Sequence, residues 1–489
     1  MKEFWKKIIN KDILIYIILI IFAMLISLHS SISPVNENGY ISTDVSIWIN
    51  IAKKMSHGEI MYLDFFDHKG PILYFIYYIG YILGKNLGIW MIDVICNAIN
   101  VLMIYKISKS ILKNKNKALI ITAICMCYLS HLCIENPCTE SIALPFILIS
   151  FYQFTKFTIN MRDFKQKESL CTGISLAIVL LLRPNLIALW IIYYLYFFIK
   201  LIKAKEIKHL QQIVTFSIIG VIIVFLPVIF YLIINRAFTD FINTYLIFNL
   251  EYASNKEKSM ITVIQYFMYH TNYIIAFMCV AYILLICEKR NLDNTEYEYL
   301  KLSCIYFIFS FYLAIMPQRR YMHYLIPILP SLIIPLAIIL KRINLNRKTN
   351  IILIVTFILY TSFSLFNTKT RIEEYSSYTS FYKEISKEVK QITKQEDNVL
   401  VLGNKAIIYL MSDREYKGKY LYQLPMANEN KEMSNKIIKE IKNDLPDIIV
   451  NFIDIKEDDE KNLTNFKDEI KIILNENYYN KDDIIYVKK

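Results

Sequence analysis

Residues 13–33 read ILIYIILIIFAMLISLHSSIS, a long apolar run that follows a basic start at Lys2, Lys6, Lys7 and Lys11. About 20 consecutive apolar residues are enough for a helix to cross the hydrocarbon core of a bilayer. A cleaved signal peptide has a shorter apolar core and ends at a small-residue cleavage site, which this run lacks. We therefore predict that residues 13–33 form the first of several membrane spans.

The composition of the 489-residue chain favours a membrane protein. Hydrophobic residues make up 55% and charged residues only 20%, and 37 Tyr and 29 Phe stand against 10 Gly and 12 Pro. These proportions exclude a disordered, a collagen-like or an ordinary water-soluble protein. The nine cysteines form no CxxC pair and none follows Cys304, so the sequence predicts neither a disulfide framework nor a zinc site.

Similar apolar runs recur along the chain and predict about eleven spans. They lie near 13–33, 88–107, 118–134, 141–157, 170–182, 186–202, 213–234, 263–287, 299–316, 324–340 and 350–366. The runs 170–182 and 186–202 are expected to form a hairpin broken at Pro184. The run 71–84 is too short to cross comfortably, and we expect it to lie flat at the outer interface.

Lysine and arginine gather in alternate loops, such as KSILKNKNK (109–117) and KRINLNRK (341–348), whereas the opposing turn ENPCTE (135–140) holds neither. Cytoplasmic loops of membrane proteins carry this excess of positive charge. The net charge of +12 is therefore a signal of topology and gives no support for nucleic-acid binding. We expect a cytoplasmic N-terminus, a multi-pass protein of the cell membrane, and an extracytoplasmic C-terminal tail.

Two segments are expected outside the lipid on the outer face, the loop 34–87 and the tail 367–489. The tail has strand-like runs at NVLVLG (398–403), YLYQLP (420–425), DIIVNF (447–452) and DIIYVKK (483–489), with an amphipathic stretch at 428–445. This alternation predicts a small α/β domain. This domain either takes part in recognition or covers part of the outer face, or it is a purely structural cap. The fold class is thus an all-α polytopic membrane domain (1–366) with a C-terminal α/β domain.

The outer loop contains the densest group of polar side chains, TDVSIWINIAKKMSHGEIMYLDFFDHKGP (43–71). Trp48, Ile51, Ala52 and Met55 recur at helical spacing and predict an amphipathic interfacial helix over 44–56. Asp44 falls in the first turn of that helix. Its carboxylate either stabilises the positive end of the helix dipole or takes part in chemistry, and spacing alone leaves both interpretations open.

The second half of the loop brings Asp64, Asp67, His68 and Lys69 into six residues. A lysine held at headgroup level is suited to binding a phosphate group. The alternative is a solvated turn with an Asp–Lys pair. His57 and His68 could also bind a divalent cation together with nearby aspartates, but no metal-binding spacing is present, and the metal stays open.

Further ionisable residues lie at the predicted outer ends of apolar runs. They are Glu135, Glu140, Arg183, Arg319, Arg320 and His323. Each of them either extends its charge toward the interface or converges with the others on a site. A negatively charged lipid headgroup whose substituent is to be transferred needs cations for its phosphate and a carboxylate for the incoming hydroxyl.

With these residues the chain resembles the GT-C superfamily of integral-membrane glycosyltransferases, in the bacterial branch that groups protein O-mannosyltransferases, aminoarabinose transferases and RgtA/B/C/D-like proteins. The matching pieces are Asp44, the Gly58–Tyr62–Asp64 stretch, HKGP (68–71), TESIALPF (139–146), LLRPN (181–185) and HYLIPILP (323–330). HKGP stands where relatives have a Lys-Pro-Pro-like element. The resemblance covers nearly all of the predicted membrane part.

The resemblance implies transfer of a sugar from a polyprenyl-phosphate-linked donor to a hydroxyl of a cell-wall glycan, a lipid or a protein on the outer face. It implies Asp44 as general base, and Lys69 with Arg319 or Arg320 as ligands of the lipid phosphate. Glu140 and His323 would shape the sugar pocket, with Asp64, Asp67, His68 and Arg183 as further substrate-binding candidates.

Two other classes of protein remain as alternatives. A lipid-linked glycan flippase or transporter would favour inverted repeats and charges at the bilayer midplane, where Asp93 is the main one. A polysaccharide polymerase would be expected to carry arginines in a large late loop, but the loop 235–262 contains only Arg236, Lys256 and Lys258. The early loop with Asp44 favours the transferase.

Overall fold

The structure is a computed structural model of the chain. It describes residues 11–36, 41–132, 135–159, 164–254, 259–271, 274–343, 379–424, 426–453, 464–482 and 484–489. The basic N-terminal residues 1–10, the predicted span 350–366 and the start of the predicted tail lie outside these ranges. The predictions for them are unchanged.

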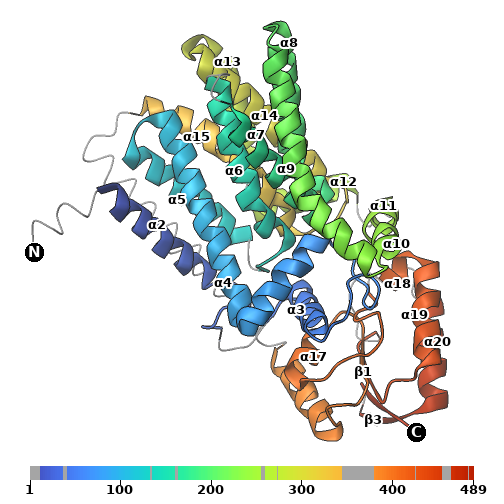
Figure 1. The fold of residues 1–489 in the computed structure, drawn as a ribbon. Coiled ribbons are helices and arrows are strands. Elements are labelled where there is room, and N and C mark those ends of the chain that lie inside the picture. Colours follow the sequence, from blue (N-terminus) through green and yellow to red (C-terminus); the bar gives the residue numbers. More distant parts are fainter. Residues whose placement is uncertain are drawn as a thin grey trace, which may run out of the picture. The chain divides into compact units, whose positions relative to one another are not determined.

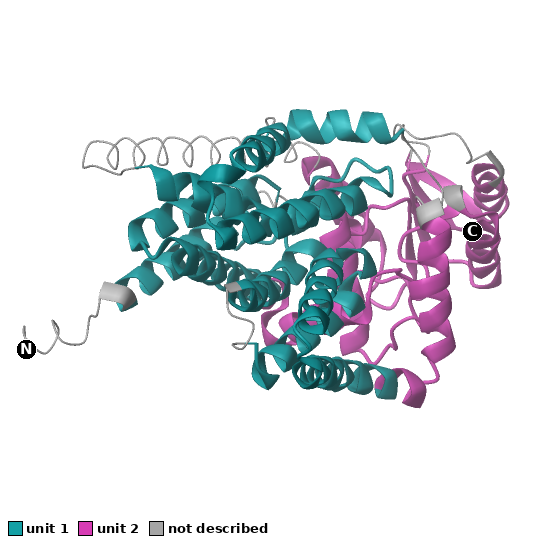
Figure 2. Ribbon diagram, turned by 90° about the horizontal axis from the view of Figure 1, so that it is seen from above, with its two compact units in different colours: residues 1–35, 89–230, 256–371 teal, residues 36–88, 231–255, 372–489 magenta. Residues whose placement is uncertain are grey.

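The chain divides into two compact units, which Figure 2 shows in different colours. Unit 1 comprises residues 1–35, 89–230 and 256–371, and unit 2 comprises residues 36–88, 231–255 and 372–489. The compact unit that contains the tail therefore also contains the predicted outer loop. The domain boundary at 366/367 itself stays a prediction.

Unit 1 is helical in its described part (Figure 1). Its helices are α2 (Lys11–Ser27), the second part of α4 (Pro71–Leu112), α5 (Lys115–Leu132), α6 (Thr139–Ile159), α7 (Gln166–Leu182), α8 (Ala188–Lys203), α9 (Ile207–Ile234), α12 (Met260–His270), α13 (Ile274–Cys287), α14 (Asn294–Ile315) and α15 (Pro330–Arg342), with short helices η2 (Pro184–Leu186), η4 (Lys289–Asn291) and η5 (Met322–Ile328). Gly173 in α7 and Gly220 in α9 let two backbones meet, since a Cβ on Gly173 would lie 2.1 Å from the Ser217 carbonyl oxygen.

Helix α4 confirms that residues 71–84 are separate from the span that follows. Helical geometry breaks at Gly84 and Lys85, and Lys85 has a φ of 51°. The predicted break at Pro184 is also confirmed, because η2 separates α7 from α8.

Two of the predicted spans occur as pairs of helices in the described part of the chain, and each pair stays a predicted span. The run 263–287 is divided into α12 and α13, and the run 324–340 into η5 and α15, which are bent by 53°. The second break has a clear physical cause. Pro327 and Pro330 lack the backbone N–H that a continuous helix needs.

Among the described residues, three helices are long and apolar enough to cross a membrane, or up to five if each bent pair is one span. Helix α9 leaves large apolar side chains uncovered, with Leu226 61% and Phe230 63% exposed. Apolar surface of this kind needs a lipid or protein partner. The count of about eleven spans and their orientation stay predictions.

Unit 2 contains a four-stranded sheet with strands β1 (Val399–Leu402), β2 (Ile448–Asn451), β3 (Tyr478–Asp482) and β4 (Ile485–Lys488), in the order β1-β2-β4-β3. Strands β1 and β2 are parallel and the other pairs are antiparallel. The helices of the tail are a helix over the described residues 379–392, α17 (Ile407–Ser412), α18 (Met426–Glu429), α19 (Lys431–Asn443) and α20 (Thr464–Asn477). The predicted α/β character is confirmed, and α19 lies within the predicted stretch 428–445.

The prediction of a strand over 420–425 was wrong, because the described part of this run is a loop. Its backbone does not pair in the sheet. Instead the Gln423 backbone amide donates to the Gly403 carbonyl (3.0 Å), and the Gly403 backbone amide donates to the side-chain oxygen Oε1 of Gln423 (2.8 Å). The edge strand β3 was missed, since its sequence YYNKD contains three polar residues that resemble a turn.

The remaining helices of unit 2 are α3 (Thr43–Ser56), the first part of α4, and the short helices α10 (Phe238–Phe241), η3 (Ile242–Ile247) and α11 (Phe248–Ser254). Helix α3 confirms the prediction over 44–56. The segment 235–262, which we treated as a loop, is therefore mostly helical in its described part.

Candidate functional site

Asp44 lies in the first turn of α3, which begins after Ser42. The side chain is half-buried, and a carboxylate here meets the positive end of the helix dipole. The predicted placement is therefore confirmed, and it is compatible with both roles that the sequence left open.

Helix α3 is more deeply buried than an amphipathic helix at an interface would be. Its polar positions Ser46, Asn50 and Lys54 are buried together with the apolar ones. The tail covers the polar face, since α17 packs against α3 and the Asn50 side-chain amide donates to the Ala406 carbonyl at 2.9 Å. The sequence pattern revealed the helix but not this second packing face.

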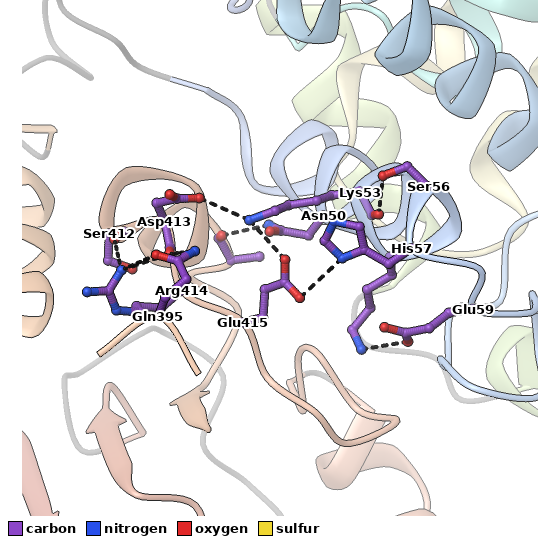
Figure 3. Close-up of polar contacts among 12 residues, drawn as sticks. Asn50, Lys53, Ser56, His57, Glu59, Gln395, Ser412, Asp413, Arg414 and Glu415 are labelled. Carbon is purple, nitrogen blue, oxygen red and sulfur yellow. Dashed lines mark hydrogen bonds and ion pairs between the residues drawn. The ribbon is translucent and has the colours of Figure 1, made fainter. Parts of the chain in front are cut away.

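An ionic cluster, drawn in Figure 3, links α3 to the loop that follows α17. Lys53 Nζ lies 3.0 Å from Asp413 Oδ1 and 2.9 Å from Glu415 Oε1. His57 Nδ1 lies 3.6 Å from the other oxygen of Glu415. The Lys53 ammonium lowers the pKa of Asp413 from its usual value, as expected for a carboxylate that accepts a charged hydrogen bond.

The carboxylate of Asp67 joins three segments of unit 2. Its Oδ2 accepts from Trp48 Nε1 in α3 (3.0 Å), and its Oδ1 accepts from the Tyr422 hydroxyl in the tail (2.6 Å) and from the His68 amide (2.8 Å). The side chain is 1% exposed. A buried carboxylate with donors on both oxygens suits a role in positioning its neighbours.

Lys69 and His68 are the basic residues of the turn 64–69, which precedes α4. Lys69 Nζ lies 3.1 Å from His68 Nε2, and His68 Nδ1 lies 3.8 Å from Asp67 Oδ1. The Lys69 carbonyl accepts from the hydroxyls of Tyr62 (2.8 Å) and Tyr74 (3.1 Å), which fixes the backbone that carries the amine.

Helix α11 supports His68 from its other side. The imidazole packs against the rings of Phe248 and Tyr252, with centroids 5.7 and 5.2 Å away. The Asn249 side-chain amide donates to the His68 carbonyl at 2.7 Å. No local pattern indicates these contacts, because Asn249 lies 181 residues after His68 along the chain.

Electrostatics place Asp44 near the same group of side chains. Burial, followed by the negative charges of Asp67 and Asp44, raises the pKa of Tyr422 well above its usual value. The Asp44 carboxylate must therefore be close enough to act on the hydroxyl that bonds to Asp67. Asp64 has a local role, since its Oδ2 accepts from the Ile60 amide at 2.7 Å.

In unit 1, Glu140 in the first turn of α6 pairs with Arg183, which follows α7. The Arg183 guanidinium also lies over the ring of Tyr324, 4.1 Å from its centroid. Glu140 and Tyr324 line a small pocket together with Asn185 and Ser310. The structure thus brings Glu140 and Arg183 together.

The other predicted residues of unit 1 lie on or just before η5. His323 is buried and its Nδ1 lies 3.2 Å from Glu135 Oε2. Arg319 is buried, whereas Arg320 is exposed and its guanidinium carbon lies 5.7 Å from the Tyr266 ring centroid. His323 adjoins Tyr324, so Glu140, Arg183 and His323 belong to one neighbourhood of unit 1.

The Glu140–Arg183 pair yields a stability prediction. Glu140→Ala should lower the free energy of unfolding by about 3 kcal/mol, because it leaves the largely buried Arg183 guanidinium without its buried carboxylate partner. The matched control is Glu135→Ala, which removes a 46% exposed carboxylate from the segment just before α6 and should cost at most about 1 kcal/mol. Thermal unfolding in detergent measures both, and equal losses would show that the buried pair has no special weight.

In the part of the chain that the structure describes, no three His, Cys, Asp or Glu side chains form a group that could hold a metal ion. His57 and His68, which the sequence suggested as ligands, pair with Glu415 and approach Asp67 instead. The question of a divalent cation stays open. Sequence reasoning missed Trp48 as a donor, Asn249 and Tyr422, and a local pattern could not have revealed them.

The fold of the chain is similar to that of known protein structures. The chain resembles two crystal structures of ArnT from Cupriavidus metallidurans, one bound to undecaprenyl phosphate and one in the apo state. For the first, the TM-score is 0.62 at 10% identity over 98% of each chain, and for the second it is 0.62 at 11% over 97% of each. No curated protein matches the sequence.

This likeness shows that the chain has the fold of ArnT over nearly its whole length, as the resemblance to aminoarabinose transferases predicted. Independently, residues 6–366 match the family model described as "Putative competence-induced protein Ccs4 N-terminal domain". Since that match covers most of the sequence, the chain belongs to the Ccs4 N-terminal domain family.

Proposed function

We propose that the protein is a membrane glycosyltransferase that moves a sugar from a polyprenyl-phosphate-linked donor to a hydroxyl acceptor on the outer face. The observation that carries this proposal is the turn in which Lys69 contacts His68 and Asp67 bonds to Tyr422, in a chain with the fold of ArnT. The negative charge of Asp44 also acts on Tyr422 and helps to raise its pKa. One of the ArnT structures contains undecaprenyl phosphate, a ligand of the proposed donor class.

In the proposed reaction, the Asp44 carboxylate takes the proton of the acceptor hydroxyl. The acceptor oxygen attacks the anomeric carbon, and the bond from that carbon to the phosphate oxygen breaks. The electron pair leaves with the polyprenyl phosphate. Lys69 then stabilises the growing negative charge on the leaving phosphate, as a fixed cation next to a partly desolvated group.

The neighbours of Lys69 support this role. His68 lies next to the Lys69 amine and is proposed to bind the same phosphate. Asp67 stabilises the turn by accepting a hydrogen bond from the His68 backbone amide. Arg320 is proposed as a second phosphate ligand because it is exposed, whereas Arg319 is buried. Glu140, Arg183 and His323 are proposed to shape the sugar pocket, and Asp64 to maintain the turn.

The proposed orientation of the chain in the membrane can be tested with a reporter cysteine. Ser56 is exposed at the end of α3, and Lys113 is exposed in the predicted inner loop 109–117. After the exposed Cys279 and Cys287 are replaced by serine, a membrane-impermeant maleimide should label Ser56→Cys in intact cells. Lys113→Cys should react only after permeabilisation. The reverse pattern would contradict an outer site and an extracytoplasmic tail.

The function is tested by comparing the lipid-linked sugars and envelope glycans of cells with and without the protein. Loss of one sugar from a glycan, lipid or protein, with accumulation of its polyprenyl-phosphate donor, would support the proposal and name both substrates. A flippase or transporter would instead change the distribution of an intact donor across the membrane. A polymerase would change chain length without removing a sugar.

A further inference from the structure

The tail contributes directly to the turn that carries Lys69. Tyr422 is 6% exposed and donates its hydroxyl to Asp67 Oδ1 across 355 residues of sequence. Nearby, the Phe66 amide donates to the Lys419 carbonyl at 2.8 Å. The tail therefore holds this turn through both a side chain and its backbone.

The tail also holds the helix that carries Asp44. Lys53 bonds to Asp413 and Glu415, and Asn50 bonds to the Ala406 carbonyl (Figure 3). Arg414 lies between these two acids in the sequence, and its side chain is buried. It donates hydrogen bonds to Thr393 Oγ1 and to the Thr393 carbonyl, both at 2.8 Å, and these bonds hold the loop in place. The tail segment 406–422 thus contacts both elements of the proposed site.

We propose that Tyr422 is a positioning residue that sets the Lys69 turn relative to the Asp44 helix, so that the tail domain is a working part of the transfer site. The expected effect on the transfer rate rests on the proposed function. The expected effect on the Lys69 turn itself does not. It assigns the tail a role other than acceptor recognition or a passive cap.

The physical reason lies in the Asp67 carboxylate. Its donors come from α3 (Trp48), from its own turn (the His68 amide) and from the tail (Tyr422). Removing the tail's hydroxyl leaves a buried anionic oxygen with one strong donor fewer, which loosens the link between the segments. A displacement of about 1 Å in a reacting group is enough to cost about 10²-fold in rate.

A matched pair of variants tests this inference. Tyr422→Phe removes the bonding hydroxyl and keeps the ring. Tyr420→Phe makes the same change two residues earlier, where the ring packs on Phe66 with centroids 5.5 Å apart and the hydroxyl makes no hydrogen bond among the described residues. Only the first variant should affect the site.

The kinetic readout separates kcat from KM in purified full-length protein. For Tyr422→Phe, kcat should fall by about 10- to 100-fold with a smaller change in the donor KM, because the reacting groups are present but misaligned. Tyr420→Phe should keep the wild-type kcat, with a similar melting temperature for both variants. Equal activity of the two variants would overturn the inference.

A structural readout works whether or not a donor has been identified. Backbone amide hydrogen exchange of residues 64–70 should be about tenfold faster in Tyr422→Phe than in wild type or Tyr420→Phe. Unchanged exchange would refute the positioning role even if transfer is observed. Conversely, faster exchange in a protein that transfers no sugar would support the positioning link and reject the proposed function.

Discussion

Asp44→Asn should abolish sugar transfer, lowering the rate by about 10²- to 10⁴-fold. The amide has the shape of the carboxylate but cannot accept a proton from the acceptor hydroxyl, and general base catalysis contributes a factor of that size. Initial rates of transfer by wild-type and variant protein in detergent measure the effect.

Loss of folding would not explain such a result. Removing one charge from the first turn of α3 should cost only about 0.3–1 kcal/mol in the free energy of unfolding. Asp468→Asn, at an exposed position of α20, is the matched control and should keep the wild-type rate. If Asp44→Asn is as active as that control, Asp44 is not the base.

Lys69→Met should lower kcat/KM for the lipid-linked donor by about 10²- to 10³-fold. The substitution keeps most of the length and the apolar stem of the side chain but removes the cation that is proposed to stabilise the leaving phosphate. Rates measured over a range of donor concentrations check this.

The control for that experiment is Lys417→Met, which removes the same charge from an exposed position of unit 2. Its kcat/KM should equal that of the wild type. Unchanged donor dependence in Lys69→Met would exclude Lys69 as a phosphate ligand, and an equal loss in both variants would point to net charge instead of a specific contact.

Much of the helical architecture could be predicted because it follows from local patterns. The spacing of Trp48, Ile51 and Met55 indicated α3, and Pro184 indicated the break between α7 and α8. Runs of β-branched and leucine residues likewise indicated β1 and β2, which are fully buried. In these cases a single element carries enough information in its own residues.

The contacts that build the site could not be predicted in the same way. The Asn50–Ala406 and Asp67–Tyr422 bonds join residues 356 and 355 positions apart, and no local periodicity encodes such pairs. The run 420–425 illustrates the consequence. Tyr420 and Tyr422 alternate as in a strand, but both are buried because their rings and hydroxyl pack on the 64–69 turn.

The presence of acidic and basic residues near Lys69 was visible in the sequence, but their roles were not. Asp67 and Lys69 are two residues apart, and composition gave them the same status as substrate ligands. Burial separates them, since Asp67 is 1% exposed with donors on both oxygens, whereas Lys69 is only partly buried. A carboxylate so enclosed is suited to positioning the turn, and Lys69 is the residue that we propose as the phosphate ligand.

The most direct test of the central claim is the release of free polyprenyl phosphate by the purified chain from a polyprenyl-phosphate-linked sugar extracted from cells that lack the protein. An envelope extract of the same cells supplies the acceptor, and mass spectrometry measures the product. We predict release by the wild type and less than about one hundredth of that rate with Asp44→Asn. Release at the wild-type rate by Asp44→Asn, or an intact donor after incubation with the wild type, would contradict the account.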